Sequence, residues 1–323
     1  MQAIVLAAGF GTRLWPLTAD RAKPAVPFLG RPLIAGLVER LTAAGFARIV
    51  VNTHHRAESI HSALAEFPGV TFSHETEILG TAGGPARARD LGLLEPDDDT
   101  LIINGKLYTE IDFAAVMAAH RETQAAVTMV LRSNSARAHF REILVDDGRI
   151  TGFGEGRVPA GPHPLLFTGI HAVRGTVLQS MKPVFSDTIR DVYPALIDAR
   201  QVHAYLADQG RWWEFSTPER YWALHQQAFN EGWGRDVVAD PNARVHSSAH
   251  VRQAIVWSGA QIEANARVER AIIGEGVSIR AGETAEDCIV VLRDRVQDPK
   301  RGEVWGDRLR VPLDVSISGA LRS

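Results

Sequence analysis

The first 25 residues constrain this chain more than any other stretch. Ala3 to Leu6 form a short apolar run, typical of a strand buried on both faces of a parallel sheet. The run ends in Ala7-Ala8-Gly9-Phe10-Gly11-Thr12, where small residues allow backbone N–H groups to approach an anion closely. Arg13 then offers a planar guanidinium to phosphate oxygens, and Lys23 adds a point charge. The stretch predicts a pocket for a polyphosphate.

The loop differs from the two commonest phosphate-binding loops. A dinucleotide fingerprint needs a third glycine where this chain has Leu14. A Walker loop needs Gly-Lys followed by Ser or Thr, and that triplet does not occur in the sequence. The alternative to a phosphate pocket is a glycine-rich strand-to-helix turn beside an incidental arginine.

Leu6 to Thr18, with Lys23-Pro24 downstream, closely resemble the signature of the sugar-1-phosphate nucleotidyltransferases, also called nucleotide-sugar pyrophosphorylases. Every fixed position of Leu-Ala-Ala-Gly-x-Gly-Thr-Arg-Leu-x-Pro-Leu-Thr is filled. The resemblance implies that Arg13 and the loop amides hold the departing phosphates and that Lys23 stabilises charge in the transition state. The nucleotide contacts that it implies in this loop are those of Leu6, Ala8, Gly9, Gly11 and Thr12.

Strand and helix patterns alternate after the loop. Apolar residues at helical spacing run from Leu33 to Leu41, with Gly45 placed to end the helix. The segments Ile49–Val51, Val70–Ser73 and Thr100–Ile103 read as buried strands, and a second helix is expected over Ala57–Glu66. This alternation predicts an α/β fold, a Rossmann-like and mostly parallel sheet with helices on both faces.

A second stretch rich in small residues runs from Glu77 to Gly84. It resembles the family's Glu-x-Leu-Gly-Thr-Ala-Gly segment, which lies over the nucleotide base. The resemblance implies backbone contacts to the base from Gly80, Thr81 and Gly83. A structural role is also open, in which Thr81 caps a helix that contains Ala86 to Leu91. Both can hold at once.

The strand over Thr100–Ile103 leads into Asn104-Gly105-Lys106. Ligands of open α/β sheets bind at the carboxyl ends of the strands, so we expect Lys106 in the same pocket as Arg13 and Lys23. The family reads Asn-Gly-Asp here, and its aspartate holds the catalytic Mg²⁺. Asn104 matches and is expected to contact the nucleotide, whereas Lys106 departs from the pattern.

A second departure lies at Trp212-Trp213-Glu214, where the family has Trp-x-Asp and the aspartate is the second metal ligand. Glu214 keeps the charge on a longer side chain, so it is either an altered metal ligand or an ion-pair partner that orients Lys106. At least one of the two tryptophans is expected in the core. Thr217-Pro218 is typical of a helix start.

The family's sugar-binding segments have partial matches. Glu155 matches the glutamate of a Glu-Lys-Pro segment, Gly156 replaces its lysine, and Arg157 is the nearest substitute. Thr168 and Gly169 lie in a stretch that resembles the strand beneath the sugar. The resemblance therefore implies sugar-phosphate contacts from these four positions, Glu155, Arg157, Thr168 and Gly169.

Several local elements are expected in this middle region. Thr109–Phe113 should begin a helix with acidic residues in its first turn. Glu142–Val145 and Arg149–Ile150 read as a hairpin turned at Asp146-Asp147-Gly148. Ile189–Pro194 is expected on a helix that ends before its proline.

From about Asp240 the pattern changes to small residue, any residue, aliphatic, with aliphatics mostly six apart, as at Val245, Val251, Ile262 and Val268. This period predicts a parallel β-helix and resembles the short left-handed β-helix of several nucleotidyltransferases, mannose-1-phosphate guanylyltransferases among them. We expect a nucleotidyltransferase domain over 1–230 and a repeat domain over 236–323. A homo-oligomer formed through the repeats is expected, and a second activity such as acyl transfer is not.

Composition excludes some classes of function. The formal net charge of −3 gives no basic footprint for nucleic acid, and no apolar run approaches the length of a membrane span. The single cysteine, Cys288, excludes an intramolecular disulfide and is expected to be a small buried residue. The amino terminus enters a strand directly, from which we expect a cytoplasmic protein.

Two hypotheses follow. In the first, the chain transfers a nucleotidyl group from a nucleoside triphosphate to a sugar 1-phosphate. Lys106 then lies roughly where the metal ion would, and the use of Mg²⁺ is altered or reduced. In the second, the chain is a catalytically inactive homologue that binds a nucleotide or nucleotide-sugar and acts as a regulatory subunit or sensor. A purely structural repeat protein leaves the amino-terminal motif unexplained.

Overall fold

The fold was analysed in a computed structural model. The structure describes residues 1–135, 138, 140–154, 163–233 and 236–316. Within this part the chain forms two compact units. Among the described residues, unit one contains residues 1–10 and 34–214, and unit two contains residues 11–33 and those from 215 to 316. The glycine-rich signature is therefore divided between the units after Phe10. Each unit is described by itself.

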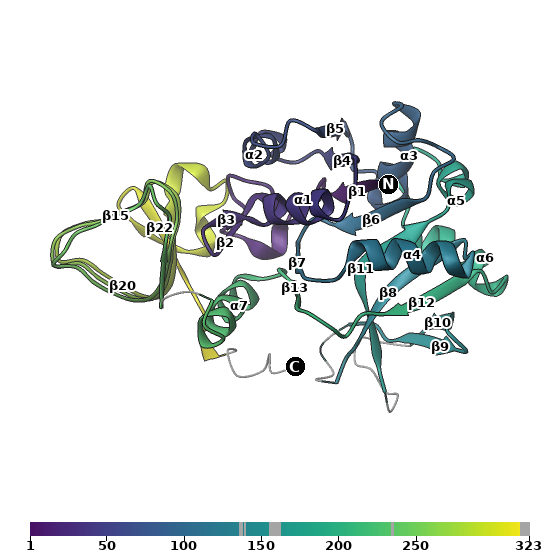
Figure 1. The fold of residues 1–323 in the computed structure, drawn as a ribbon. Helices are drawn as coiled ribbons and strands as arrows, with labels where there is room; N and C mark the ends of the chain where they lie inside the picture. The colour runs from purple at the N-terminus through teal and green to yellow at the C-terminus, as the bar shows by residue number, and fades with distance from the viewer. Residues whose placement is uncertain (136–137, 139, 155–162, 234–235, 317–323) are drawn as a thin grey trace. The chain divides into compact units, whose positions relative to one another are not determined.

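A nine-stranded sheet forms the centre of unit one (Figure 1). Four strands at one edge are parallel to one another, as the sequence predicts. Strand β11 runs antiparallel to both of its neighbours, and β10 is antiparallel to β12 and β9, so seven of the nine strands point the same way. In spatial order the strands are β5 (Val70–His74), β4 (Arg48–Thr53), β1 (Gln2–Leu6), β6 (Thr100–Asn104), β11 (Leu165–Val173), β8 (Val127–Ser133), β12 (Val202–Leu206), β10 (Arg149–Phe153) and β9 (Ile143–Asp146).

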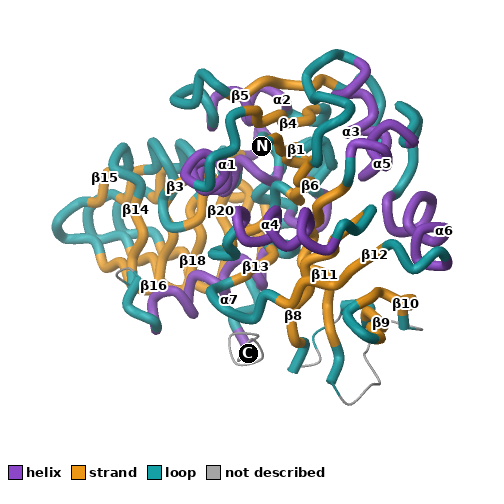
Figure 2. Tube along the Cα trace, turned by 45° about the vertical axis from the view of Figure 1, so that its right-hand side comes forward, coloured by secondary structure: helices purple, strands orange, loops and turns teal. Residues whose placement is uncertain are grey.

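Helices cover both faces of this sheet, with α1 and α4 on one face and α3, α5 and α6 on the other (Figures 1 and 2). Their bounds are α1 (Leu33–Ala43), α3 (Gly80–Asp90), α4 (Phe113–Thr123), α5 (Gly175–Ser180) and α6 (Tyr193–Asp198), and α2 (Ala57–Ala63) precedes β5. Ile4, Val50 and Ile102 pack with Ala82 and Ala86 of α3 in one buried cluster. The neighbouring strand residues point to the opposite face, because side chains alternate along a strand. The predicted α/β class is confirmed.

Two local predictions in unit one are wrong. The stretch after Lys106 begins as strand β7 (Leu107–Thr109), and helix α4 starts only after Asp112, whose carboxylate accepts the Ala115 N–H at 3.0 Å. A three-residue strand is too short to show a period, so the sequence pattern missed it. Pro194 does not end a helix either: it lies in the first turn of α6, where its missing N–H costs nothing, after a π turn over Thr188–Val192.

The predicted hairpin of β9 and β10 is confirmed. Asp147 and Gly148 have φ of 46° and 70°, and these left-handed conformations suit the tight connection.

Unit two contains a parallel β-helix, as the six-residue period predicts. Residues His250, Arg267 and Thr284 are paired on successive strands, so each coil takes 17 residues, close to three hexapeptides. Alanines and branched aliphatics fill its interior, and Cys288 is buried among them as expected. The strands of the coils are β14 (Val237–Ala239), β15 (Arg244–Val245), β16 (His250–Val256), β17 (Gln261–Ile262), β18 (Arg267–Ile273), β19 (Ser278–Ile279) and β20 (Thr284–Leu292).

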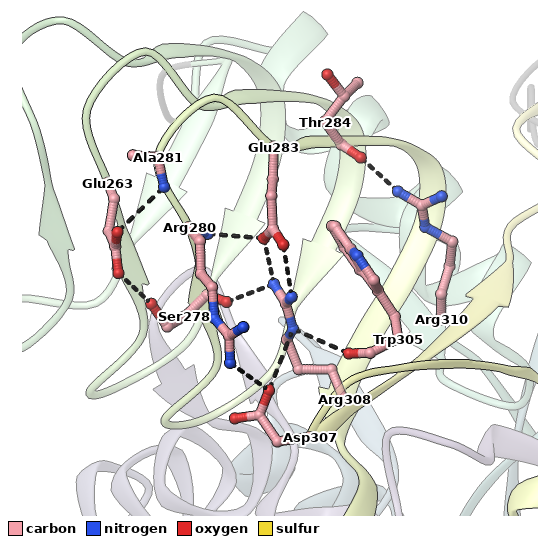
Figure 3. A network of polar contacts seen from close by, with 10 residues as sticks. All are labelled: Glu263, Ser278, Arg280, Ala281, Glu283, Thr284, Trp305, Asp307, Arg308 and Arg310. Atoms are coloured by element: carbon pink, nitrogen blue, oxygen red, sulfur yellow. Dashed lines mark hydrogen bonds and ion pairs between the residues drawn. The ribbon is translucent and has the colours of Figure 1, made fainter.

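An antiparallel hairpin of β21 (Glu303–Trp305) and β22 (Arg308–Pro312) pairs with β20, the last coil strand. Between them lie two single 3-10 turns, η4 (Arg293–Arg295) and η5 (Pro299–Arg301). Arg308 is fully buried there: it donates to both carboxylate oxygens of Glu283, at 2.5 and 2.8 Å, and its guanidinium lies 4.0 Å from the centre of the Trp305 ring (Figure 3).

Helix α7 (Pro218–Asn230) begins where predicted: Thr217 caps it by accepting the Arg220 N–H at 3.3 Å, and Pro218 lies in the first turn. Its Tyr221 hydroxyl donates to the Pro27 carbonyl at 2.6 Å, beside the short strands β2 (Pro27–Phe28) and β3 (Arg31–Pro32). His225 Nε2 accepts the Leu29 N–H at 3.3 Å, and Nδ1 donates to the Tyr221 carbonyl at 2.9 Å. The histidine is therefore neutral, and burial lowers its pKa to about 4.

We predict that Arg308→Met lowers the free energy of unfolding of the β-helix by about 3 kcal/mol, since it leaves the Glu283 carboxylate without its buried partner. Urea unfolding followed by circular dichroism measures this. Arg280→Gln is the matched control, because Arg280 pairs with Asp307 at the surface, 58% and 63% exposed, and should change the free energy by less than about 1 kcal/mol. Equal losses from the two variants would contradict the assignment.

We predict that acid destabilises the protein through His225. Its folded pKa is about 4, below the ordinary value of 6.5, so the unfolded chain binds more protons between these values. Stability contributed by the neutral ring is complete above pH 6.5 and falls below it, by at most about 1.4 kcal/mol per pH unit. Urea unfolding at pH 7, 6 and 5 gives the slope of the free energy of unfolding against pH. His225→Gln should reduce this slope by the contribution of one proton. The exposed His250→Gln should leave the slope unchanged.

Candidate active site

In unit one, predicted site residues lie at the carboxyl ends of β1 and β6. Leu6 pairs with Asn104, and the Gly105 N–H donates to the Leu6 carbonyl at 2.9 Å. Ala8 and Gly9 follow β1 directly, and Lys106 follows β6. Parallel pairing thus brings these candidates to one edge of the sheet, which is where open α/β sheets bind ligands.

A buried polar network supports this edge, and sequence reasoning missed it. The Ala7 N–H donates to Asn52 Oδ1 at 2.6 Å, and Asn52 Nδ2 donates to Glu75 Oε1 at 2.7 Å. The second oxygen of Glu75 accepts the Leu79 N–H at 2.9 Å. Both side chains are buried. The network therefore ties the start of the predicted phosphate-binding loop to the segment that precedes α3. Its signal was present in the sequence: one amide and one carboxylate at the ends of apolar strands.

The predicted cap of α3 by Thr81 is wrong. Leu79 is the N-cap and makes no side-chain cap bond. Thr81 instead lies inside the first turn, where its hydroxyl donates to Asp187 at 3.0 Å and accepts the Thr188 N–H at 2.8 Å. The hydroxyl is used to hold the segment around residue 187 against the helix.

The same segment explains two of the glycines. A Cβ on Gly80, whose φ is +75°, would lie 2.4 Å from the Ser186 carbonyl oxygen, and one on Gly83 would lie 2.1 Å from that of Val184. At both glycines the group that approaches closely is a backbone carbonyl of this chain. Contacts of Gly80, Thr81 and Gly83 with a nucleotide base stay a prediction.

Lys106 and Glu214 form an ion pair between the Lys106 ammonium and the Glu214 carboxylate. The pair depends on two short strands, since β13 (Trp212–Glu214) pairs antiparallel with β7 and sets Glu214 opposite Leu107. The indole N–H of Trp212 donates to the Thr168 carbonyl at 2.9 Å, and Trp213, buried as expected for one of the two, lies 5.3 Å from the Tyr108 ring. The Glu214 side chain is only 11% exposed, so the lysine neutralises a largely buried carboxylate.

The residues at the two family metal positions do not fit a divalent ion. A protonated lysine has no lone pair to donate, and it already holds the carboxylate that would remain. In the part of the chain that the structure describes, no three His, Cys, Asp or Glu side chains group as metal ligands would. We therefore derive no chemical step through a metal at this position, and the use of Mg²⁺ stays a prediction.

The predicted sugar-phosphate residues divide into two pairs. Thr168 is buried in β11, and its hydroxyl donates to the Val130 carbonyl at 2.8 Å. Gly169 has φ +79° at an irregularity in the β11–β8 pairing, and a Cβ there would lie 2.3 Å from Asn104 Nδ2. Gly169 thus makes room for the Asn104 amide. Glu155 and Arg157 lie outside the described residues.

In unit two, the rest of the predicted phosphate-binding loop forms a compact turn. Gly11 has φ +67° and precedes η1 (Thr12–Leu14), in which Thr12 and Arg13 are exposed. The Thr18 hydroxyl donates to the Gly11 carbonyl at 3.0 Å. Lys23 opens η2 (Lys23–Ala25); it is 8% exposed, and its Nζ lies 3.5 Å from the Ser216 carbonyl oxygen. That Lys106 shares a pocket with Arg13 and Lys23 stays a prediction, because the two groups belong to different units.

Comparison with known proteins identifies the class. Residues 2–231 match the nucleotidyl transferase family. The chain belongs to this family. Residues 232–301 match the GlmU-like C-terminal hexapeptide family, in agreement with the β-helix of this nucleotidyl transferase family member.

Its curated relatives include a mannose-1-phosphate guanyltransferase of Schizosaccharomyces pombe, 31% identical over 229 residues, which are 68% of this chain and 62% of that protein. A mannose-1-phosphate guanylyltransferase catalytic subunit beta of Drosophila pseudoobscura pseudoobscura is 28% identical over 226 residues, 68% of this chain and 60% of that protein. The match therefore spans about three fifths of the length of these relatives.

Among solved structures, HddC from Yersinia pseudotuberculosis has a similar fold, with a TM-score of 0.60 and 21% identity. The match covers 70% of this chain and 98% of that one. The same protein in complex with GMP-PN gives a TM-score of 0.59, with the same identity and coverage. Within the described residues, every helix is too short or too polar to cross a bilayer.

We predict that Gly169→Ala is much more harmful than Gly148→Ala. Both positions have a positive φ, which costs an alanine about 1–2 kcal/mol. A Cβ at Gly148 meets nothing within 4 Å, whereas one at Gly169 collides with the Asn104 amide. The loss of unfolding free energy should be larger at Gly169 by about 1–3 kcal/mol, in urea unfolding of both variants. Equal losses would show that Asn104 moves aside freely.

Proposed function

We propose that this chain transfers a nucleotidyl group from a nucleoside triphosphate to a sugar 1-phosphate, giving a nucleoside diphosphate sugar and pyrophosphate. A phosphate oxygen of the sugar 1-phosphate attacks the α-phosphorus, a new P–O bond forms, and the bond to the β-phosphate breaks with its electron pair on the departing pyrophosphate. Family membership and the complete amino-terminal signature support this reaction. The names of the relatives favour GTP and mannose 1-phosphate as the first pair of substrates to test.

The observation that carries the proposal is the ion pair at the end of β6. An ammonium has three N–H donors, and Glu214 takes one direction. We propose that the other donors bind substrate phosphate oxygens, so that Lys106 supplies part of the charge that a divalent ion supplies in the family. A unit charge at 4 Å from a phosphate charge contributes about 4 kcal/mol at an effective dielectric constant near 20.

The remaining roles follow the signature. Arg13 and the loop amides bind the phosphates that depart, where a guanidinium can hold two oxygens at once. Lys23 neutralises the charge that develops as the α–β bond breaks. Glu214 orients Lys106 and holds its ammonium group in place.

The second candidate function is a catalytically inactive homologue that binds a nucleotide or nucleotide-sugar. It is favoured by the same observation read differently: both metal positions of the family have changed, and the resulting ion pair is electrically neutral. The two candidates differ in turnover and not in nucleotide binding, so a single assay separates them.

The experiment measures pyrophosphate release from purified protein with each nucleoside triphosphate and several sugar 1-phosphates, with Mg²⁺ and with excess chelator. We expect release that survives the chelator. Release only with Mg²⁺ would overturn the role of Lys106 and leave nucleotidyl transfer. Nucleotide-sugar binding without release from any pair would overturn the enzyme and leave the binding protein. In that case Lys106→Asp should gain turnover with Mg²⁺.

We predict that Lys106→Met lowers kcat/KM for this release about 100-fold or more, because one charge opposite the reacting phosphates is lost. The double variant Lys106→Met, Glu214→Gln removes both charges of the pair, and it should be equally impaired. Lys182→Met, on the surface, should keep kcat/KM within about twofold of the parent. Recovery of activity in the double variant would show that the loss in Lys106→Met comes from the Glu214 carboxylate and not from the missing ammonium.

A further inference from the structure

Four charged side chains in unit two form a closed ring of alternating sign. Arg21 donates to Asp20 at 3.0 Å and to Glu275 at 2.6 Å. Arg295 lies 2.9 Å from Asp20 and 3.6 Å from Glu275, which completes the ring. Asp20 and Arg21 belong to the amino-terminal signature region, Glu275 lies in the turn between β18 and β19, and Arg295 ends η4. The ring thus joins two β-helix segments to the loop that carries the candidate phosphate ligands.

Aromatic residues support the same junction. The Arg21 guanidinium lies 4.7 Å from the centre of the Trp257 ring, which is buried between β16 and β17. The Trp257 indole N–H donates to the Tyr221 hydroxyl at 3.2 Å, and that hydroxyl donates to the Pro27 carbonyl. The loop is therefore held on both sides of Lys23, at residues 20–21 and at Pro27.

Short covalent and steric steps connect the ring to the candidate ligands. Ala22 is fully buried and separates Arg21 from Lys23 by one residue. A Cβ on Gly11 would lie 3.1 Å from the Lys23 Cβ, so the start of the Arg13 turn packs directly on Lys23. A displacement of Arg21 would therefore displace Lys23 and then the turn at Gly11, because these residues are closely packed.

The ring by itself contributes little to the free energy of folding. Its side chains are partly exposed, from 14% at Arg21 to 40% at Glu275, and pairs of this kind add little free energy. Burial raises the pKa of Asp20, but its hydrogen bonds and charge interactions with Arg21 and Arg295 lower the pKa below the usual value. Asp20 therefore carries its negative charge at neutral pH. What it supplies is a fixed geometry, since each guanidinium meets two carboxylates in set directions.

We propose that the β-helix is a positioning element for triphosphate binding, in which Glu275 and Arg295 act through Asp20 and Arg21 to fix Lys23 and the Gly11–Arg13 turn. The inference rests on the proposed function for the identity of the ligand. It assigns a role in nucleotide binding to residues more than 250 positions from the signature, in a domain for which the sequence suggests only stacking or oligomerisation.

The experiment compares full-length Glu275→Gln and Arg295→Gln with Arg295→Lys, which keeps the charge, and with Arg280→Gln, which breaks an exposed pair elsewhere on the β-helix. Amide hydrogen exchange of residues 11–25 is measured in each protein. Calorimetry then gives the Kd of GTP and of inorganic pyrophosphate at one ionic strength. Thermal unfolding of the β-helix reports on stability.

We expect Glu275→Gln and Arg295→Gln to raise exchange over residues 11–25 about tenfold and to weaken GTP and pyrophosphate binding about tenfold, with the unfolding midpoint within about 2 °C of the parent. Arg295→Lys should recover most of the binding, and Arg280→Gln should match the parent. Unchanged exchange overturns the proposal, and so does faster exchange with unchanged binding. A parent that binds both ligands without turnover would sink the transfer reaction alone. A parent that binds neither would sink both proposals.

Discussion

The pairing of β7 with β13 is the interaction on which the candidate site of unit one depends. It brings Glu214 to Lys106 across 108 residues of sequence, on strands of three residues each. Without β13 the lysine would lose this carboxylate, and without Lys106 the largely buried Glu214 would lose the ammonium with which it is paired. Each omission is costly, because breaking a buried ion pair destabilises far more than the pair itself stabilises. The two departures from the family signature are therefore a single structural feature.

The sequence predicts those parts of the fold that local patterns determine. Apolar runs locate β1, β4, β5 and β6, and the six-residue period locates the β-helix, because each pattern reports which side chains must be buried. The Lys106–Glu214 pair was also predictable, since the resemblance aligned both residues with positions that share one ligand. Parallel strands that end together then bring Leu6 and Asn104 to the same edge.

Other parts were beyond local patterns. Strand β7 has three residues and no period. Pro194 opens a helix instead of closing one because it lies in the first turn of α6, where a backbone N–H is not needed. Small residues predict close approach without identifying what approaches. At Gly80 and Gly83 the neighbour is the chain around Ser186, and at Gly169 it is the Asn104 side chain. Thr81 likewise bonds Asp187, a partner 106 residues away that no capping rule could supply.

The two charged arrangements differ in a way that fits their chemistry. The ring in unit two uses arginines, whose planar forks bond two carboxylates at once and lose little freedom in doing so, which suits a fixed support. The end of β6 uses lysine, a compact charge with three rotatable donors on a flexible stem. Such a group can keep one bond to Glu214 while it turns its other donors to a phosphate that arrives and leaves. Arginine at 106 would hold its partners more rigidly, and aspartate would need a metal to bind the same phosphate. The choice of cation thus separates the arginines of a fixed support from the lysine that we propose as the phosphate-binding group.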